Sequence, residues 1–274
     1  MPSVKFEIRT ATPEDIPALR QNWSASFGDT DEYLDFFFHH RFDCENTLVA
    51  CVGKSPAAQL FLLPAKLRSG DSELCVDYLF AAATHPEYRK QGIMSALLSY
   101  ARTLCAERGK DAIVLLPSSP SLYNYYAQRG YEKAFSRRRW VVTRDELACL
   151  RSPVKETADV LSVLQSVLNG RDGLCWDADA LAYALEEHRL FRGAYAASEH
   201  AFVSFGEDEA ACLCTPEDFG ECAALLLGLS DLPQFTLTFP SDIPNGIWED
   251  GGMLCRMCNN EIHLRDAYIS FAME

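Results

Sequence analysis

Hydrophobic residues recur at two different spacings along the chain, and the stretch from residue 74 to residue 105 contains both. Leu74 to Ala83 is apolar except for Asp77, which predicts a buried strand. Beyond Thr84 the apolar side chains recur every three or four residues, as in an amphipathic helix: Ile93, Met94, Leu97, Leu98, Ala101, Leu104 and Cys105. We therefore expect a sharp turn from a strand into a helix between Thr84 and Ile93.

The same patterns predict the elements around this turn. Thr12 to Asp15 has the composition of a helix start, with proline at the first helical position and acids in the first turn. The predicted elements before the turn are a strand at Phe6–Arg9, a helix ending near Phe27, a helix at Thr30–His40 and strands at Thr47–Val52 and Ala57–Leu67. Those after it are a strand at Ala112–Leu116, a helix beginning at Ser119 and stopped by Gly130, and a strand at Tyr131–Val142.

The second half of the chain repeats this order of elements with little sequence identity. The first half is expected to run helix, helix, three strands, helix, strand. The corresponding predictions in the second half are helices at Thr157–Leu168 and Asp177–Leu190, strands near Ala194–Ala197, His200–Phe205 and Ala210–Thr215, a helix from Pro216 to about Leu229 and a strand at Phe235–Phe239. Arg151 to Pro153 is the expected linker, which gives two domains, residues 1–148 and 149–274.

The turn after Thr84 has the chemistry of an anion site. The first N–H groups of a helix have no partner within the helix, and the helix dipole adds partial positive charge there. Arg89 and Lys90 supply cations, and Gly92 lets the backbone approach a ligand because it has no side chain. A solvated basic turn is the alternative interpretation if no second motif agrees.

Two motifs in this region resemble those of the GNAT acyltransferases. Arg89-x-x-Gly92-x-Met94 is similar to the family's pyrophosphate loop, Arg/Gln-x-x-Gly-x-Gly/Ala, and departs from it at Met94. The segment from Tyr126 to Tyr131 resembles the family's downstream signature Tyr-x-x-x-Gly-Phe/Tyr. The resemblance implies an α/β (α+β) fold with two GNAT-like lobes, each a mixed, mostly antiparallel twisted sheet flanked by helices.

The resemblance also implies the residues that bind coenzyme. The pantetheine arm would lie on the free backbone groups of Ala82, Ala83 and Thr84, where the family's strand splays from its neighbour. The pyrophosphate would take the N–H groups of the loop, with charge from its cations; these residues are Arg89, Lys90, Gln91, Gly92, Ile93, Met94 and Ser95. The family's tyrosine lies beside the coenzyme sulfur, so Tyr126 is the expected acid that protonates the leaving thiolate.

These residues predict an acetyl-CoA-dependent N-acetyltransferase acting on a primary amine of a small molecule, with a homo-oligomer as an allowed state. One alternative is a non-catalytic acyl-CoA-binding sensor, which would need no proton donor at Tyr126. Another is acetylation of a protein or peptide amine. The aromatic residues of the predicted helix at Thr30–His40 are interpreted as core, with one wall of a substrate cleft as the alternative.

The base that deprotonates the amine stays open at this point. Asp77 and Tyr78 lie on the strand leading to the loop, and alternation lets only one of them face a cleft. His85 titrates near neutral pH, although next to Pro86 it could simply shape the turn. A water chain to bulk solvent would also serve.

The second lobe is expected to lack a coenzyme site. Its equivalent of the loop, Thr215 to Glu221, has three carboxylates where the first has two cations, and these would repel a pyrophosphate. A catalytic GNAT half joined to a degenerate one resembles the Eis-type acetyltransferases, which carry a further lipid-carrier-like domain that this chain ends too early to contain. Their base is the terminal carboxylate, and without that domain Glu274 is a doubtful counterpart.

Composition narrows the class of protein. The 274 residues are 48% hydrophobic and 23% charged, which is typical of a globular protein with a sizeable core. A formal charge of −14 argues against nucleic-acid binding and permits a cationic substrate. No secretory signal or spanning segment is recognisable, so no membrane partner and a cytoplasmic location are expected.

Eleven cysteines allow two interpretations. Cys255 and Cys258, together with Cys212 and Cys214, could offer four thiolates to zinc. Most of the cysteines lie in apolar stretches, where the side chain behaves as a small hydrophobe. We therefore expect free thiols and no metal site, and the other histidines show no metal-ligand spacing.

Overall fold

The structure is a computed structural model that describes residues 4–157, 159–207, 209–240, 243, 245–257 and 262–270. The chain folds into two compact units. The first comprises residues 1–66, 74–132 and 253–261, and the second comprises residues 67–73, 133–252 and 262–274. Among the described residues, no helix is long and apolar enough to cross a membrane.

The first unit is built on a mixed sheet. Its strands, in their order across the sheet, are β1 (Glu7–Thr10), β2 (Thr47–Val52), β3 (Ser55–Ser69), β4 (Ser72–Thr84), β5 (Ala112–Leu115) and the end of β12 (Ile247–Arg256). Strand β2 runs antiparallel to β1 and β3, whereas β4 and β5 are parallel. Parallel neighbours need a long crossover, and here it contains the helix after the loop.

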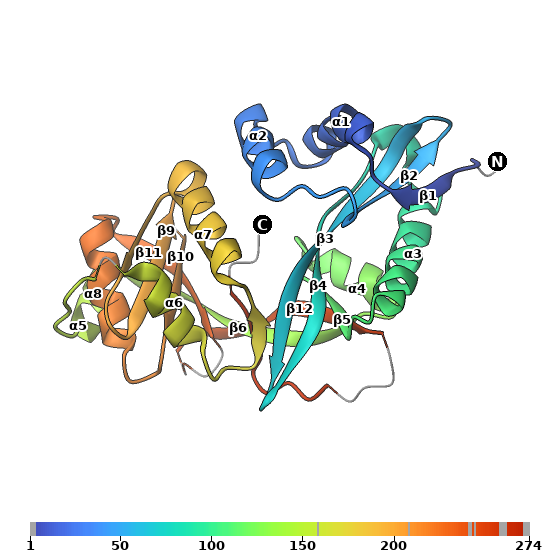
Figure 1. The fold of residues 1–274 in the computed structure, drawn as a ribbon. Helices are drawn as coiled ribbons and strands as arrows, with labels where there is room; N and C mark the ends of the chain where they lie inside the picture. Colours follow the sequence, from blue (N-terminus) through green and yellow to red (C-terminus); the bar gives the residue numbers. More distant parts are fainter. Residues whose placement is uncertain are drawn as a thin grey trace. The chain divides into compact units, whose positions relative to one another are not determined.

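Helices cover both faces of this sheet (Figure 1). Alternate residues of β3 show which helices lie on which face: Leu60 and Leu62 pack in one cluster with α3 (Ile93–Glu107) and α4 (Pro120–Ala127). The Phe61 ring points the other way, toward α1 (Ile16–Phe27) and α2 (Asp31–His40). Because helices cover both faces of the sheet, consecutive residues of β3 are buried, and this part of the sequence is a nearly continuous apolar run.

The aromatic side chains of α1 and α2 form a core. The Trp23 ring lies 4.7 Å from Phe37, 5.4 Å from Phe61 and 5.5 Å from Phe80, measured between centroids. Trp23 and Phe37 are almost completely buried. The interpretation of these helical aromatics as core is therefore supported for the buried members, since a cleft wall requires exposed rings.

The second unit contains the elements predicted for it, in the predicted order, together with further elements that were not predicted. Its helices are α5 (Arg144–Leu150), α6 (Val160–Leu168), α7 (Ala178–Glu187) and α8 (Phe219–Leu229), and its strands are β6 (Glu132–Thr143), β8 (Ala194–Ala197), β9 (Ala201–Gly206), β10 (Glu209–Cys214) and β11 (Gln234–Pro240), with the short strands β7 (Gly173–Cys175) and β13 (Tyr268–Ile269). Strand β9 is antiparallel to β8 and β10, and β10 is parallel to β11. This pairing reproduces that of β2 to β5 in the first unit.

Each unit completes its sheet with a strand from the other half of the sequence. Met253 to Arg256 of β12 pair with β5 in the first unit, with Met253 opposite Leu115. Residues 137–143 of β6 pair with β11 in the second unit. The prediction of a single boundary after residue 148 does not anticipate this exchange. The mixed, mostly antiparallel fold class itself is confirmed.

Candidate active site

The two parallel strands of the first unit separate before β4 ends. Their ladder joins Val76–Tyr78 to Ala112–Val114 and stops there, six residues before the end of β4 at Thr84. Ala81 has a φ of 43°, a left-handed conformation that non-glycine residues rarely adopt. The break leaves the backbone of Ala82, Ala83 and Thr84 beyond the ladder with β5.

The loop that follows presents a row of unbonded N–H groups. Within the described chain, no acceptor bonds the backbone N–H groups from Lys90 to Ser95, and the first bond into α3 is Ala96 N to Gly92 O at 3.1 Å. Lys90 and Gly92 both have left-handed φ values, 63° and 81°. A Cβ at Gly92 would meet nothing within 4 Å. The start of α3 is therefore an open cluster of donors at the positive end of a helix dipole.

The two loop cations are arranged differently. Arg89 is held by the loop, because its Nε donates to Thr84 O at 2.9 Å and its Nη2 donates to Ser26 Oγ at 3.3 Å. Lys90 and Gln91 are exposed, and the Gln91 amide donates to Glu87 O. Ile93 is buried, whereas Met94 is half-buried against the core of the first unit. Part of the Met94 side chain therefore packs against the core of the first unit, and the rest is accessible to solvent.

Arg129 is a site residue that sequence reasoning missed. Its guanidinium donates twice to Ser95 Oγ, at 2.7 and 3.1 Å, and lies 3.5 Å from the centroid of the Tyr125 ring. These contacts fix the segment after α4 to the first turn of α3. The signal in the sequence was its place inside the Tyr126–Tyr131 motif, in which the family pattern specifies only the aromatic and glycine positions.

Tyr126 lies in the same hydrophobic cluster as the first turns of α3. It is 9% exposed, and its ring stands edge-on to the rings of Tyr125 and Tyr131 at 5.4 and 5.5 Å. Burial, reinforced by Tyr125 and opposed by Arg129, raises the pKa of Tyr126 to about 12. The phenol is therefore protonated at neutral pH and can act only as a proton donor.

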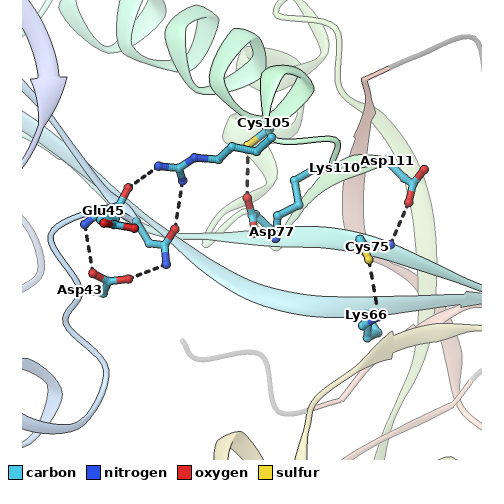
Figure 2. A network of polar contacts seen from close by, with 10 residues as sticks. Asp43, Glu45, Lys66, Cys75, Asp77, Cys105, Lys110 and Asp111 are labelled. Atoms are coloured by element: carbon cyan, nitrogen blue, oxygen red, sulfur yellow. Dashed lines mark hydrogen bonds and ion pairs between the residues drawn. The ribbon is translucent and has the colours of Figure 1, made fainter.

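The two strand candidates for a base are both buried. Figure 2 shows the Asp77 carboxylate in an ion pair with Lys110 at 2.5 Å and accepting from the Cys105 thiol at 3.3 Å. Asp77 is 1% exposed, and burial of the Cys105 thiol, reinforced by the Asp77 charge, raises the pKa of Cys105. Tyr78 is 2% exposed and stacks on Phe80. Neither faces an open cleft in this structure.

His85 and the terminal residue complete the set of candidates. The His85 side chain is 26% exposed, but its Nδ1 is buried without a hydrogen-bond partner in the described chain. Glu274 lies outside the described residues. Of the candidate bases that the structure describes, His85 is the one whose side chain is partly exposed to solvent. Its Nδ1 has no hydrogen-bond partner in the described chain.

The cysteines form no described metal centre. Cys212, Cys214 and Cys222 are buried and free, and burial raises the pKa of Cys222 well above its ordinary value. Cys255 is buried in the first unit, and Cys258 lies outside the described residues. No group of three or more potential metal ligands occurs in the described part of the chain.

Comparison with known proteins gives one family match and several similar structures. Residues 7–134 match the family model described as an acetyltransferase (GNAT) domain. A GCN5-related N-acetyltransferase from Anabaena variabilis is 17% identical, with a TM-score of 0.71 over 93% of this chain and 73% of its own. Eis1 from Mycobacterium abscessus is 15% identical, with a TM-score of 0.66 over 92% and 74% of the two chains.

A protein from Pyrococcus horikoshii has nearly the same extent as this chain. It is 14% identical, with a TM-score of 0.60, and the alignment covers 97% of this chain and 95% of that one. At these identities the solved structures show the fold alone. No curated protein sequence matches the chain.

Proposed function

Because residues 7–134 form a GNAT acetyltransferase domain, we propose that this protein moves an acetyl group from acetyl-CoA to a primary amine of a small molecule. The observation that carries the proposal is the open row of N–H groups from Lys90 to Ser95, placed directly after the strand end that leaves its neighbour. This arrangement suits an extended ligand with an anionic diphosphate at one end and an amide-containing arm at the other.

The residues present fit such a ligand. Loop N–H groups and the start of α3 would hold the pyrophosphate, with Lys90 free to approach it and Arg89 bracing the loop. The half-buried backbone of Ala82 and Thr84, and that of buried Ala83, would bond the arm. Coenzyme A supplies a thioester whose carbonyl carbon the amine attacks. The chain contributes alignment, and effective molarities of well-aligned pairs are equivalent to roughly 7–11 kcal/mol.

Tyr126 would donate its hydroxyl proton to the leaving sulfur. Its burial keeps this proton in place at neutral pH, since its pKa is raised to about 12. General acids of this kind contribute on the order of 10²–10⁴ in rate. The contacts of Arg129 with Ser95 and Tyr125 hold the tyrosine segment against the loop that would bind the other end of the coenzyme.

The test measures thiol release from acetyl-CoA with a panel of amines, together with calorimetry of coenzyme binding. We expect turnover with at least one amine, and a loss of kcat of about 100-fold in Tyr126→Phe with unchanged coenzyme affinity. Tyr100→Phe is the matched control, because Tyr100 is exposed on α3. Coenzyme binding without turnover of any amine would indicate a sensor, and turnover only with peptides would move the acceptor to a protein amine.

A further inference from the structure

Arg129 is a half-buried cation that has no carboxylate partner in the described chain. Its guanidinium donates to Ser95 Oγ and to Tyr125 O and lies over the Tyr125 ring, and all of these partners are neutral. Other arginines of the first unit bind a carboxylate: Arg9 binds Asp15 at 2.6 Å, Arg20 binds Asp35 at 2.8 Å and Arg256 binds Glu132 at 2.7 Å. A charge that is partly removed from water is normally compensated by an opposite charge. The surroundings of Arg129 therefore suit an anion that is not part of the chain.

Ser95 connects this cation to the cluster of N–H donors at the start of α3. It is the third residue of the helix, and side chains of a helix tilt toward its N-terminus, so the Ser95 hydroxyl lies over the turn that begins at Gly92. Its oxygen accepts from Nε and Nη2 of Arg129, at 3.1 and 2.7 Å, and its proton is donated to no acceptor in the described chain. The hydroxyl is therefore free to donate to a ligand, and the two bonds that it accepts from a cation make it a stronger donor.

Arg129 also contacts the segment that carries Tyr126. Its backbone N–H donates to Tyr126 O at 2.8 Å, and Tyr131 N donates to the same oxygen at 3.2 Å. The Tyr125 ring, over which the guanidinium lies, stands edge-on to the Tyr126 ring with the centroids 5.4 Å apart. A single residue is therefore in contact both with the start of α3 and with the residue expected to protonate the leaving sulfur.

We propose that Arg129 is a further cation of the coenzyme site, which acts on the diphosphate through the Ser95 hydroxyl and thereby links diphosphate binding to the position of Tyr126. The inference rests on the proposed acetyl transfer. The charge of exposed Lys90 is screened by salt, whereas Arg129 is half-buried, where opposite charges attract each other more strongly. Arg129 acts through Ser95 and does not touch the reacting atoms, so it is a positioning residue.

Calorimetry with coenzyme A tests the contact directly. We expect Arg129→Gln to raise the Kd about tenfold, the effect of one charge-assisted hydrogen bond, and Ser95→Ala to do the same. Because Arg129 acts through Ser95, adding Arg129→Gln to Ser95→Ala should raise the Kd by less than about twofold more. Arg108→Gln is the control, since it removes the same charge at the far end of α3 and should leave the Kd unchanged. Ser95→Ala deletes only a hydroxyl group, so its result does not depend on how well Arg129→Gln folds.

Turnover with two acyl donors separates an effect on the diphosphate from a general loosening of the site. S-acetylpantetheine has the thioester arm of acetyl-CoA but no diphosphate. We expect Arg129→Gln to lower kcat several-fold with both donors, because Tyr126 is held less firmly, and to raise the KM about tenfold for acetyl-CoA alone. A purely structural role of Arg129 would instead raise the KM for both donors by the same factor.

Three results would overturn the role of Arg129. The first is binding of coenzyme A within about twofold of wild type by Arg129→Gln or Ser95→Ala, and the second is a rise of about 100-fold in the Kd of the double variant, since the two side chains would then act independently. The third is an equal rise in KM for both donors. If the Kd values follow the expected pattern but no amine is acetylated, the proposed function fails and the role of Arg129 at the diphosphate stands.

Discussion

The two strand-to-helix turns of this molecule occupy corresponding places in its two units but differ in what surrounds them. A Cβ at Gly92, at the start of α3, would meet nothing within 4 Å. A Cβ at Gly220, in the first turn of α8, would meet Leu150 O and Ser152 Oγ, each at 2.8 Å. Ser152 N also donates to Gly220 O at 3.0 Å. The start of α3 is open for a ligand, whereas the start of α8 is covered by its own chain.

The charged residues of the two turns differ in the same way, being available to a ligand in the first turn and bonded within the unit in the second. Arg89 and Lys90 precede α3, while the acids of the second turn are used within the second unit. Asp218 Oδ2 accepts from Thr215 Oγ1 at 2.6 Å, and Glu221 Oε2 accepts from the buried Ser198 hydroxyl at 2.5 Å. These two carboxylates accept hydrogen bonds from hydroxyl groups of their own unit. The carboxylates and the start of the helix at the second turn therefore contact their own unit, whereas those features of the first turn are available to a ligand.

The tyrosine helix marks a further difference. In the first unit α4 follows β5 and carries Tyr126. In the second, only residues 241–246 separate β11 from β12, which is too short a connection for a helix of that length. Among the residues of the second unit that the structure describes, the start of α8 is covered and no helix corresponding to α4 supplies a counterpart of Tyr126. We propose that this unit is a GNAT-like lobe without a coenzyme site.

The largest expected effect is that of Gly92→Val. A β-branched residue at a φ of 81° is strained, and its side chain would fill the space that a diphosphate must enter. We expect the Kd for acetyl-CoA to rise by about 100-fold or more, measured by calorimetry.

Gly220→Ala is the matched control for this change. Its Cβ would press on Leu150 and Ser152, so the protein should unfold at a Tm lower by several degrees with an unchanged Kd. A Gly92→Val protein that binds coenzyme within about threefold of wild type would contradict the assignment of the loop.

The ionisation of Tyr126 is the next largest effect. Its folded pKa is about 12 against 10.0 for an ordinary tyrosine. The neutral phenol is favoured by folding, so this contribution to stability is complete below pH 10 and is lost as the pH rises through 12. Spectrophotometric titration of the wild type minus Tyr126→Phe should show one phenol that ionises near pH 12. A difference spectrum that titrates near pH 10 would mean that the ring is solvated.

Removal of the loop cations should weaken coenzyme binding about tenfold. Arg89→Gln with Lys90→Gln leaves the N–H donors in place and removes the charge that complements the diphosphate. The loss should shrink as salt is added, because the Lys90 side chain is exposed. Arg108→Gln is the control: it lies at the far end of α3 and bonds Asn46 and Glu45 O, and it should not alter the Kd.

Local signals in the sequence predicted most elements and the turn itself. The helix at Thr30–His40 is present with Thr30 capping it, and α4 begins at Pro120 as its Ser-Pro start indicated. Such features are set by residues next to each other. Helix α5 was not predicted, although Thr143 and Glu146 form a capping box, because the residues between the strand ending at Val142 and the linker beginning at Arg151 were left unassigned.

Contacts between distant segments could not be predicted in this way. The pairing of Met253 with Leu115 joins residues from opposite halves of the sequence, and no local pattern specifies it. The hydrogen bonds from Arg129 to Ser95 cross 34 residues.

The smallest expected effect tests whether charge alone separates the two turns. Glu217→Lys with Asp218→Lys gives the second turn the cations of the first, but Leu150 and Ser152 still cover the start of α8. We therefore expect calorimetry to show the same single coenzyme site per chain, with the same Kd as wild type. The loss of the Thr215–Asp218 hydrogen bond should lower the free energy of unfolding by only about 1 kcal/mol. Binding of a second coenzyme per chain would mean that Leu150 and Ser152 can move aside for a ligand. In that case the lack of cations, and not steric coverage by these residues, would be what prevents coenzyme binding at the second turn of the wild-type protein.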